Sequence, residues 1–468
     1  MSSPVKKYPA SAYLSLIIFP LIGIFAFFIN FPLPAYTVMG FTVGSNSTVL
    51  VNHLTSLLKA LLWNGNLKVM PYVVLAIAIY GVIDLVLRRK KHFSNTLNIS
   101  FSIIKCIGVV FLLFAVFNFG PELLIGEARE QLSGQTISQF VMNGVLITIS
   151  ISIPLAAMFL PFLLNYGLVE FVGVLVRPIM RPLFKLPGRS AVILVSALLG
   201  NFSVAHIAVN DQYEGGFMTE REALAISTGF CGSSIAFMMV LATNSRIINT
   251  HWNAYVWSSF LITILITLVG VRIPPVSRLR DGYAPGIKSH PETVYKKDLF
   301  KNALSEGLGV ASSAENPVKG IAHIMKSTAG ILAAIIMGAG FSTSAGMLLY
   351  FYTPIFEWIG IIFRPLMWLV QIPSAEVVTA STGAAFSLLE VTIPSLLVMA
   401  GEWSFHIRYM MAVVPITSVI FLGSFVPSLI STNLPVKFWH LMVIWVERMI
   451  LSVLLSGLFA LLLFGIPG

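Results

Sequence analysis

Five stretches of the chain contain no aspartate, glutamate, lysine or arginine: 8–58, 131–169, 247–271, 327–356 and 409–436. A helix needs about 20 predominantly apolar residues to cross the hydrocarbon core of a bilayer, and each stretch is longer than that. Only 10% of all residues are charged, whereas a soluble protein carries about 25%. A β-barrel would instead show short segments of alternating hydrophobicity. The sequence therefore predicts an all-α polytopic membrane protein.

The apolar segments expected to form membrane helices lie at 12–30, 69–87, 101–119, 139–165, 190–210, 223–245, 252–272, 321–351, 376–400, 407–432 and 438–466. A weaker segment at 48–62 is expected to lie in the membrane interface. The polar stretch 273–320 is expected to be a cytoplasmic loop without a folded domain. No phosphate-binding GxxxxGK[ST] motif occurs in the chain, so hydrolysis of ATP by this chain is not expected.

The net charge of +10 is assigned to cytoplasmic loops rather than to nucleic-acid binding, because basic residues concentrate on the cytoplasmic side of membrane proteins. Lys6-Lys7 and the run Arg88-Arg89-Lys90-Lys91 place the N-terminus and the second loop inside. The two cysteines, Cys106 and Cys231, lie in apolar segments. They are expected to be small hydrophobic residues without a disulfide.

An internal repeat is the most informative pattern. Residues 170–180 read EFVGVLVRPIM and residues 357–367 read EWIGIIFRPLM, with five identities at one constant spacing. The identical pairs are Glu170 and Glu357, Gly173 and Gly360, Arg177 and Arg364, Pro178 and Pro365, and Met180 and Met367. The first copy is followed by further basic residues and the second is not, so the copies are expected on opposite membrane faces. Inverted repeats of this kind are typical of secondary transporters.

Counting the crossings predicts two re-entrant hairpins. The basic loop 273–320 stays cytoplasmic only if segment 190–210 enters and leaves on one side, with a helix break at Gly200-Asn201-Phe202-Ser203. By the repeat, 376–400 is the second hairpin. The alternative is eleven simple spans. Four regions are expected: N-terminal transmembrane helices (1–138), repeat 1 (139–272), the cytoplasmic loop (273–320) and repeat 2 (321–468).

The run from Gly200 to Thr243 carries a family resemblance. It includes Gly200-Asn201-Phe202-Ser203, His206, Tyr213, Gly215-Gly216, Thr219, Arg221-Glu222-Ala223, Gly229-Phe230 and Ser234-Ile235-Ala236-Phe237. This run resembles the YjiH family of bacterial inner-membrane proteins with Gate (nucleoside recognition) domains, which are distantly similar to concentrative nucleoside transporters. The resemblance implies a multi-pass protein of the bacterial inner membrane, a nucleoside-like solute and homo-oligomerisation.

Polar residues inside a membrane are functional candidates, because each needs a partner there. The predicted substrate-binding residues are Asn201, Ser203 and His206 of the first hairpin, Ser233 and Ser234 of a small-residue stretch, and Ser381, Thr382 and Ser387 of the second hairpin. Glu390 is the predicted ion-coupling residue, with pairing to a serine or to backbone as the structural alternative. His206 has the alternative of a packing residue.

Other motifs are given structural roles. Thr219 and Glu222 fit a T-x-x-E capping box that opens a helix. Glu447 and Arg448, adjacent in the last apolar segment, are expected to have structural partners elsewhere. No catalytic motif, metal-ligand cluster or cofactor site is predicted. The sequence therefore predicts a secondary transporter for a small polar organic solute, coupled to sodium or protons; the alternative is a non-transporting membrane protein acting in assembly or signalling.

Overall fold

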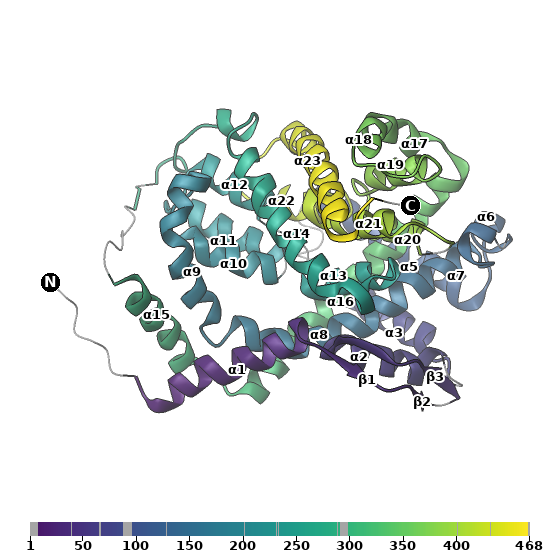
Figure 1. Cartoon of the computed structure of the whole chain (residues 1–468), viewed down its shortest axis with the longest axis horizontal. Coiled ribbons are helices and arrows are strands. Elements are labelled where there is room, and N and C mark those ends of the chain that lie inside the picture. Colours follow the sequence, from purple (N-terminus) through teal and green to yellow (C-terminus); the bar gives the residue numbers. More distant parts are fainter. Residues whose placement is uncertain are drawn as a thin grey trace.

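The computed structural model describes residues 8–38, 40–64, 67–87, 96–127, 129–200, 202–230, 232, 234–287, 289–290, 298–399, 401–430 and 432–466. In these residues the chain is mainly helical (Figure 1). The basic pairs at 6–7 and 88–91, used above to orient the chain, lie outside the described residues, as do Asn201, Cys231 and Ser233.

Seven helical segments of the described chain are long and apolar enough to cross a membrane. They are α1 (Ala10–Phe28), α3 (Met70–Leu87), α5 (Thr96–Phe117), the continuous run α7, η3 and α8 (Ile137–Val141, Met142–Leu146, Ile147–Leu164), α14 (Ile248–Gly270), α16 (Pro317–Tyr352) and α23 (Phe438–Phe464). Large apolar side chains such as Leu14, Ile17 and Leu21 of α1 are exposed, as a lipid-facing surface requires. The chain is a multi-pass helical membrane protein, as predicted.

Between these spans, one order of short helices occurs twice. After α8 come α9 (Leu168–Ile179), η4 (Met180–Phe184), α10 (Ser190–Leu199), α11 (Phe202–Glu214), α12 (Glu220–Gly229) and α13 (Ile235–Asn244), and then α14. After α16 come α17 (Ile355–Gly360), η6 (Ile361–Phe363), α18 (Arg364–Leu369), α19 (Val377–Phe386), α20 (Ile393–Leu397), α21 (Phe405–Ser418) and α22 (Phe425–Ile430), and then α23. In Figure 1, α9–α12 and α17–α19 lie on opposite sides of α23.

The helix break predicted in the Gly200 region is present. Helix α10 ends at Leu199 and α11 begins at Phe202, on either side of Gly200. A helix of ten residues rises only about 15 Å, half the thickness of the hydrocarbon core. We name α10–α11 hairpin 1 and α19–α20 hairpin 2. That each hairpin enters and leaves on one face, and that the two repeats are inverted, stay predictions.

The two sets of helices also pack in a reciprocal way. Helix α11 of the first set contacts α22 of the second, and α20 of the second contacts α13 of the first. Elements α11 and α20 hold equivalent places in the repeated order, as do α13 and α22. Reciprocal contacts of this kind are what an approximate two-fold relation between two repeats produces.

Several segments differ from the expectations. Segments 223–245 and 407–432, expected to be single membrane helices, are each divided into two short helices, α12 with α13 and α21 with α22. Residues 30–49 form two small antiparallel sheets, β1 (Asn30–Leu33) with β4 (Asn46–Val49) and β2 (Tyr36–Val38) with β3 (Phe41–Val43). Pro32 and Pro34 explain why the first span stops there, since proline disrupts a helix interior. The weaker apolar segment 48–62 contains α2 (Leu50–Lys59) and the start of η1 (Ala60–Asn64), and its position in the membrane interface stays a prediction. Short elements α6 (Glu122–Ile125), η2 (Glu130–Leu132) and η5 (Val276–Arg278) complete the described structure.

The loop 273–320 is not structureless. It contains α15 (Leu299–Ser313), which packs against α9 and α1. Gly167 has φ +87°, and a Cβ there would lie 2.1 Å from the Gly307 carbonyl oxygen. The absence of a side chain at Gly167 thus lets the two backbones touch. This helix was not predicted from the sequence because its apolar face is short and charged residues lie on both sides of it in the sequence.

The contact between α9 and α15 places two acidic groups near each other. Burial, and secondarily the carboxylate of Glu306, raise the pKa of Glu170 above its usual value, and its Oε2 is buried without a hydrogen-bond partner in the described residues. A raised folded-state pKa means that stability falls as the pH rises above the unfolded pKa of about 4.3.

Glu170→Gln is therefore expected to raise the melting temperature at neutral pH and to flatten its dependence on pH. The repeat supplies a matched control, because Glu357 is paired with Arg364 at 2.8 Å. Glu357→Gln should not stabilise. Thermal unfolding of the detergent-purified variants between pH 4 and 8 measures both; a destabilised Glu170→Gln at pH 8 would contradict the argument.

The predicted capping box is confirmed. Thr219 N donates to Glu222 Oε2 at 3.0 Å, and Glu222 N donates to Thr219 Oγ1 at 3.3 Å. Glu222 also accepts from Arg181 Nη1 at 3.0 Å. The capping box and the ion pair with Arg181 fix the start of α12 against η4. Thr219 and Glu222 therefore have structural roles.

Candidate functional site

The interruption between α21 and α22, residues 419–424, is bound to hairpin 2 by hydrogen bonds between backbone atoms. Leu422 N donates to Leu388 O at 2.6 Å, and Gly423 N donates to Leu389 O at 3.0 Å. We call residues 419–424 the α21–α22 break. Gly423 is required for this approach, because a Cβ there would lie 2.6 Å from Glu390 Oε2 and 3.1 Å from Leu389 O.

Hairpin 1 reaches the same place from the other repeat. The ring of Phe202 lies 5.7 Å from that of Phe421 and 5.5 Å from that of Phe425, centroid to centroid. One turn further along α11, His206 Nδ1 and Ser428 Oγ are 3.0 Å apart. The first residue of α11 and the tip of hairpin 2 therefore meet at the α21–α22 break.

His206 is fully buried. Its Nε2 makes no hydrogen bond within the described part of the chain, although the backbone of Ser227 on α12 faces the ring. The ring of Phe425 lies edge-on to the imidazole at 4.8 Å. A buried nitrogen without a firm partner is available to a bound polar group.

Glu390 lies at the tip of hairpin 2 and is 7% exposed. Ser342 Oγ, from α16, donates to Glu390 Oε2 at 2.7 Å, and Val391 N donates to Oε1 at 3.1 Å. No basic side chain of the described residues pairs with it. A serine and a backbone N–H are the partners expected if Glu390 has a structural role instead of an ion-coupling role. They hold the carboxylate beside the α21–α22 break.

The other predicted residues lie further away or are satisfied locally. Ser381 Oγ donates to Val378 O at 3.0 Å within α19, and Ser387 Oγ, at the C-cap of α19, donates to Ala384 O at 2.6 Å. Thr382 Oγ1 is buried without a partner in the described residues, but its backbone packs on Gly360 of α17. Ser234 caps α13 by accepting from Phe237 N at 3.3 Å. Ser203 lies in the first turn of α11, and Asn201 and Ser233 fall outside the described residues.

Arg448 of α23 binds the end of α21 just before the α21–α22 break. The structural partner that the sequence predicted for Arg448 is therefore present. Its Nε donates to Ser418 O at 3.2 Å and its Nη2 donates to Thr417 O at 2.6 Å. These carbonyls belong to the last turn of α21, where a helix leaves its acceptors unpaired. A cation is also favoured at the negative end of the helix dipole.

Sequence reasoning missed Gly423, Ser428 and Ser342. A signal for the first was present, because the dipeptide Gly232-Ser233 after α12 recurs as Gly423-Ser424 after α21. Ser428 and Ser342 are single hydroxyls in apolar segments, and nothing in the sequence distinguishes them from other such serines.

Comparison with known proteins gives a partial family match. Residues 146–246 match the model of the Gate family, described as nucleoside recognition; this range runs from η3 to just beyond α13. An uncharacterised protein of Alkalihalophilus pseudofirmus is 27% identical over 367 residues, which cover 75% of this chain and 73% of the relative.

Solved structures of CNTnw are similar over nearly the whole length. A doubly substituted form in an outward-facing state is 13% identical with a TM-score of 0.42, covering 96% of this chain and 97% of that one. The inward-facing, substrate-bound form is 12% identical with a TM-score of 0.41, covering 96% and 98%. The match to the Gate model, described as nucleoside recognition, thus covers hairpin 1, α12 and α13.

Proposed function

We propose that this protein is a secondary membrane transporter for a small polar organic solute, with nucleosides as the first class to test. The observation that carries the proposal is the meeting of both hairpins at the α21–α22 break. Non-helical backbone at membrane depth is tolerated where it is buried in protein or lines a cavity. Transporters use interrupted helices in this way to present backbone groups to solute and ions.

The residues at the break suit a solute with an aromatic ring and hydroxyl groups. Phe202, Phe421 and Phe425 pack on one another as an aromatic cluster, and a planar base can stack on such rings once alternating access separates them. His206 Nε2 supplies a buried polar atom beside that cluster. The nucleoside-recognition description of the Gate match supports the same class.

Glu390 is the proposed coupling group. Its carboxylate touches both the tip of hairpin 2 and, through Gly423, the α21–α22 break. A proton or sodium ion bound there would alter the charge at the point where hairpin 2 and α22 are joined. In the proposed cycle, the site between the hairpins is exposed alternately to each side of the membrane.

The test is the melting temperature of the purified protein against a panel of nucleosides, amino acids and dipeptides. A ligand that binds only the folded state raises its stability, so at least one solute is expected to raise the melting temperature of the wild type. Glu390→Gln should lose the effect of sodium or of acidic pH on that shift. The matched control is Glu402→Gln, because Glu402 is 96% exposed at a distance of 3.9 Å from Arg408.

The outcomes separate the two functions. A solute shift that is unchanged in Glu390→Gln would keep the transporter and assign Glu390 to structure. The absence of any shift across the panel, together with no flux in proteoliposomes, would favour the non-transporting alternative.

A further inference from the structure

A segment that follows α14 and η5 crosses the end of hairpin 1 at which α10 begins and α11 ends. We call it the strap; it consists of residues 279–287 and 289–290 of the predicted cytoplasmic loop. Glu220 N, the first amide of α12, donates to Gly282 O at 2.9 Å, and His290 N donates to Gly216 O at 3.0 Å. The backbone of the strap is therefore hydrogen-bonded to the turn between α11 and α12 and to the start of α12.

Side chains join the strap to the start of α10 as well. Arg189 is the N-cap residue of α10, and its Nη2 donates to His290 O at 3.0 Å. The Phe217 ring contacts both residues: it stacks on the His290 ring at 4.6 Å between centroids, and the guanidinium carbon of Arg189 lies 5.1 Å from its centroid. Arg221 Nη2 of α12 pairs with Asp281 Oδ2 at 3.0 Å. The strap thus holds α10 and α12 together.

Hairpin 2 is held at the corresponding end by a direct contact. Glu376, the N-cap residue of α19, accepts from Ser404 N at 2.7 Å and also from Ser404 Oγ. Ser404 is the N-cap residue of α21, the helix that corresponds to α12 in the repeated order. In the first repeat, Thr219 at this place is engaged in its capping box with Glu222, and the Arg189 side chain cannot accept a hydrogen bond. The strap therefore makes the connection that Glu376 makes in the second repeat.

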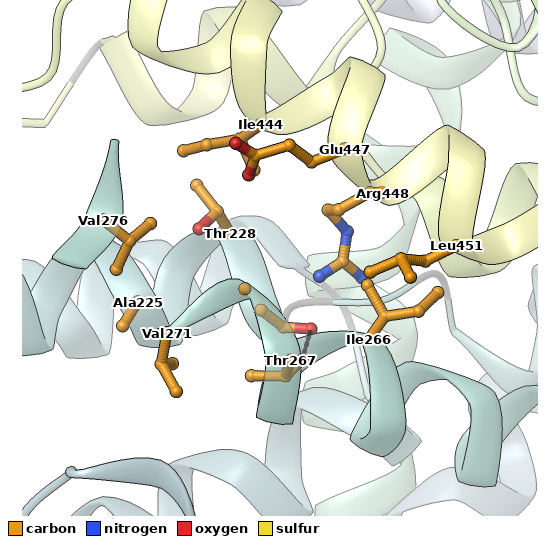
Figure 2. Close-up of a pocket in the computed structure, with 12 residues that line it drawn as sticks. Ala225, Thr228, Ile266, Thr267, Val271, Val276, Ile444, Glu447, Arg448 and Leu451 are labelled. Carbon is orange, nitrogen blue, oxygen red and sulfur yellow. Dashed lines mark hydrogen bonds between the residues drawn. The ribbon is translucent and has the colours of Figure 1, made fainter. Parts of the chain in front are cut away.

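The other end of α12 is anchored directly to α14. Thr267 Oγ1 of α14 donates at 2.8 Å to the carbonyl of Gly229, the last residue of α12 (Figure 2). A Cβ at Gly229 would lie 2.5 Å from Thr267 Cγ2, so the two helices are in close contact there. Helix α12 is thus packed on α14 at one end and held by the strap at the other.

The contacts of the strap lie near the protein surface. The side chain of Asp281 is 59% exposed and that of Arg221 is 22% exposed, and an exposed ion pair contributes little to stability. Residues 285–287 are exposed, and the apolar Leu279 and Ala284 are only half-buried. Water can replace the backbone hydrogen bonds when the strap lifts away. Such a segment opens at a lower free energy than the packed helices around it.

We propose that the strap is a latch on hairpin 1. While the strap is docked, the start of α10 and the start of α12 are held together. When it is released, the two can separate while the membrane-spanning helices stay folded. That release accompanies solute transport, by letting hairpin 1 move, rests on the proposed function; the local opening of the strap does not.

Hydrogen exchange of the purified full-length protein in detergent, followed by mass spectrometry, measures this opening. The amides of Glu220 and His290 are expected to exchange faster than those in the middle of α16 and to depend little on low concentrations of denaturant. Arg189→Ala removes the guanidinium and should speed the exchange of both amides roughly tenfold. Arg272→Ala is the matched control and should leave both unchanged, because Arg272 is exposed and donates to Leu268 O of α14.

A second variant covers the case in which Arg189→Ala does not fold. Asp281→Asn removes the ion pair with Arg221 and should speed exchange at Glu220 about threefold. Asp298→Asn, at the N-cap of α15, is its control and should not. The latch is refuted if the strap amides exchange only together with those of α16, or if the folded variants exchange at the wild-type rate.

A disulfide between residues 220 and 282 tests the link to transport. The backbones of these residues are hydrogen-bonded, and the atoms nearest to a Cβ at Gly282 belong to the flexible side chain of Arg280. The pair Glu220→Cys and Gly282→Cys is introduced together with Cys106→Ala and Cys231→Ala. Oxidation should slow exchange at the strap and abolish solute flux in proteoliposomes, and reduction should restore both.

The outcomes separate the latch from the proposed function. Unchanged flux in the oxidised protein would show that the strap stays docked during transport, and it would overturn the latch. If the wild type shows no flux but the strap opens locally and responds to Arg189→Ala, the latch is supported and the result counts against the proposed function instead.

Discussion

Arg448→Ala is expected to cause the largest loss of stability of any single substitution considered for this protein. Arg448 is 3% exposed, and two carbonyl oxygens of α21 would lose their charged donor. A hydrogen bond to a charged group contributes roughly 1.5–3 kcal/mol, and an acceptor left buried adds a desolvation cost. A loss of about 3–5 kcal/mol follows.

Thermal unfolding in detergent measures this loss, and Arg272→Ala is the matched control. Arg272 follows α14 and is exposed, and within the described residues its guanidinium donates to Leu268 O of α14, so its removal should change little. Arg448→Lys keeps the charge but cannot reach both carbonyls in fork geometry, and should fall between wild type and alanine. Equal melting temperatures for Arg448→Ala and Arg272→Ala would show that the break does not depend on the guanidinium.

Gly423→Ala is expected to have the second-largest effect and to act on function as well. The new Cβ would lie 2.6 Å from Glu390 Oε2 and 3.1 Å from Leu389 O, so hairpin 2 must move away from the α21–α22 break. Overpacking of this kind costs roughly 1–3 kcal/mol. Any solute-induced rise in melting temperature should be lost, because the hairpin tip is displaced.

Gly338→Ala separates this clash from the general effect of replacing glycine. Gly338 lies in α16, and a Cβ there would meet nothing within 4 Å. Alanine in a helix interior is favoured over glycine by roughly 0.5–1 kcal/mol. Gly338→Ala should therefore be neutral or stabilising, and a stabilised, solute-responsive Gly423→Ala would refute the close approach.

The sequence predicted the long spans because hydrophobic runs are local, but it did not predict that 223–245 and 407–432 are each divided into two short helices. Uncharged stretches marked the spans, and the Gly200 region marked the interruption of hairpin 1. The match of 170–180 with 357–367 anticipated two short helices in equivalent places, and Glu357 and Arg364 of that motif do pair.

The site was less predictable because its contacts join distant parts of the chain. His206 was selected from the sequence, but its partner Ser428 lies in a different repeat and carries no local signature. The joint between hairpin 2 and the α21–α22 break is made of backbone atoms of Leu388, Leu389, Leu422 and Gly423. Backbone pairing leaves little trace in residue types, so only the glycine could have been suspected.

The contact between His206 and Ser428 also has a consequence for biosynthesis. The two residues are 222 positions apart, and a ribosome adds about 5–20 residues per second. Hairpin 1 is therefore synthesised roughly 10 to 45 seconds before α22 exists. During that interval His206 lacks its partner Ser428, and Phe202 lacks the ring of Phe421 on which it packs. The first repeat therefore remains incompletely packed in the membrane until α22 has been synthesised and inserted.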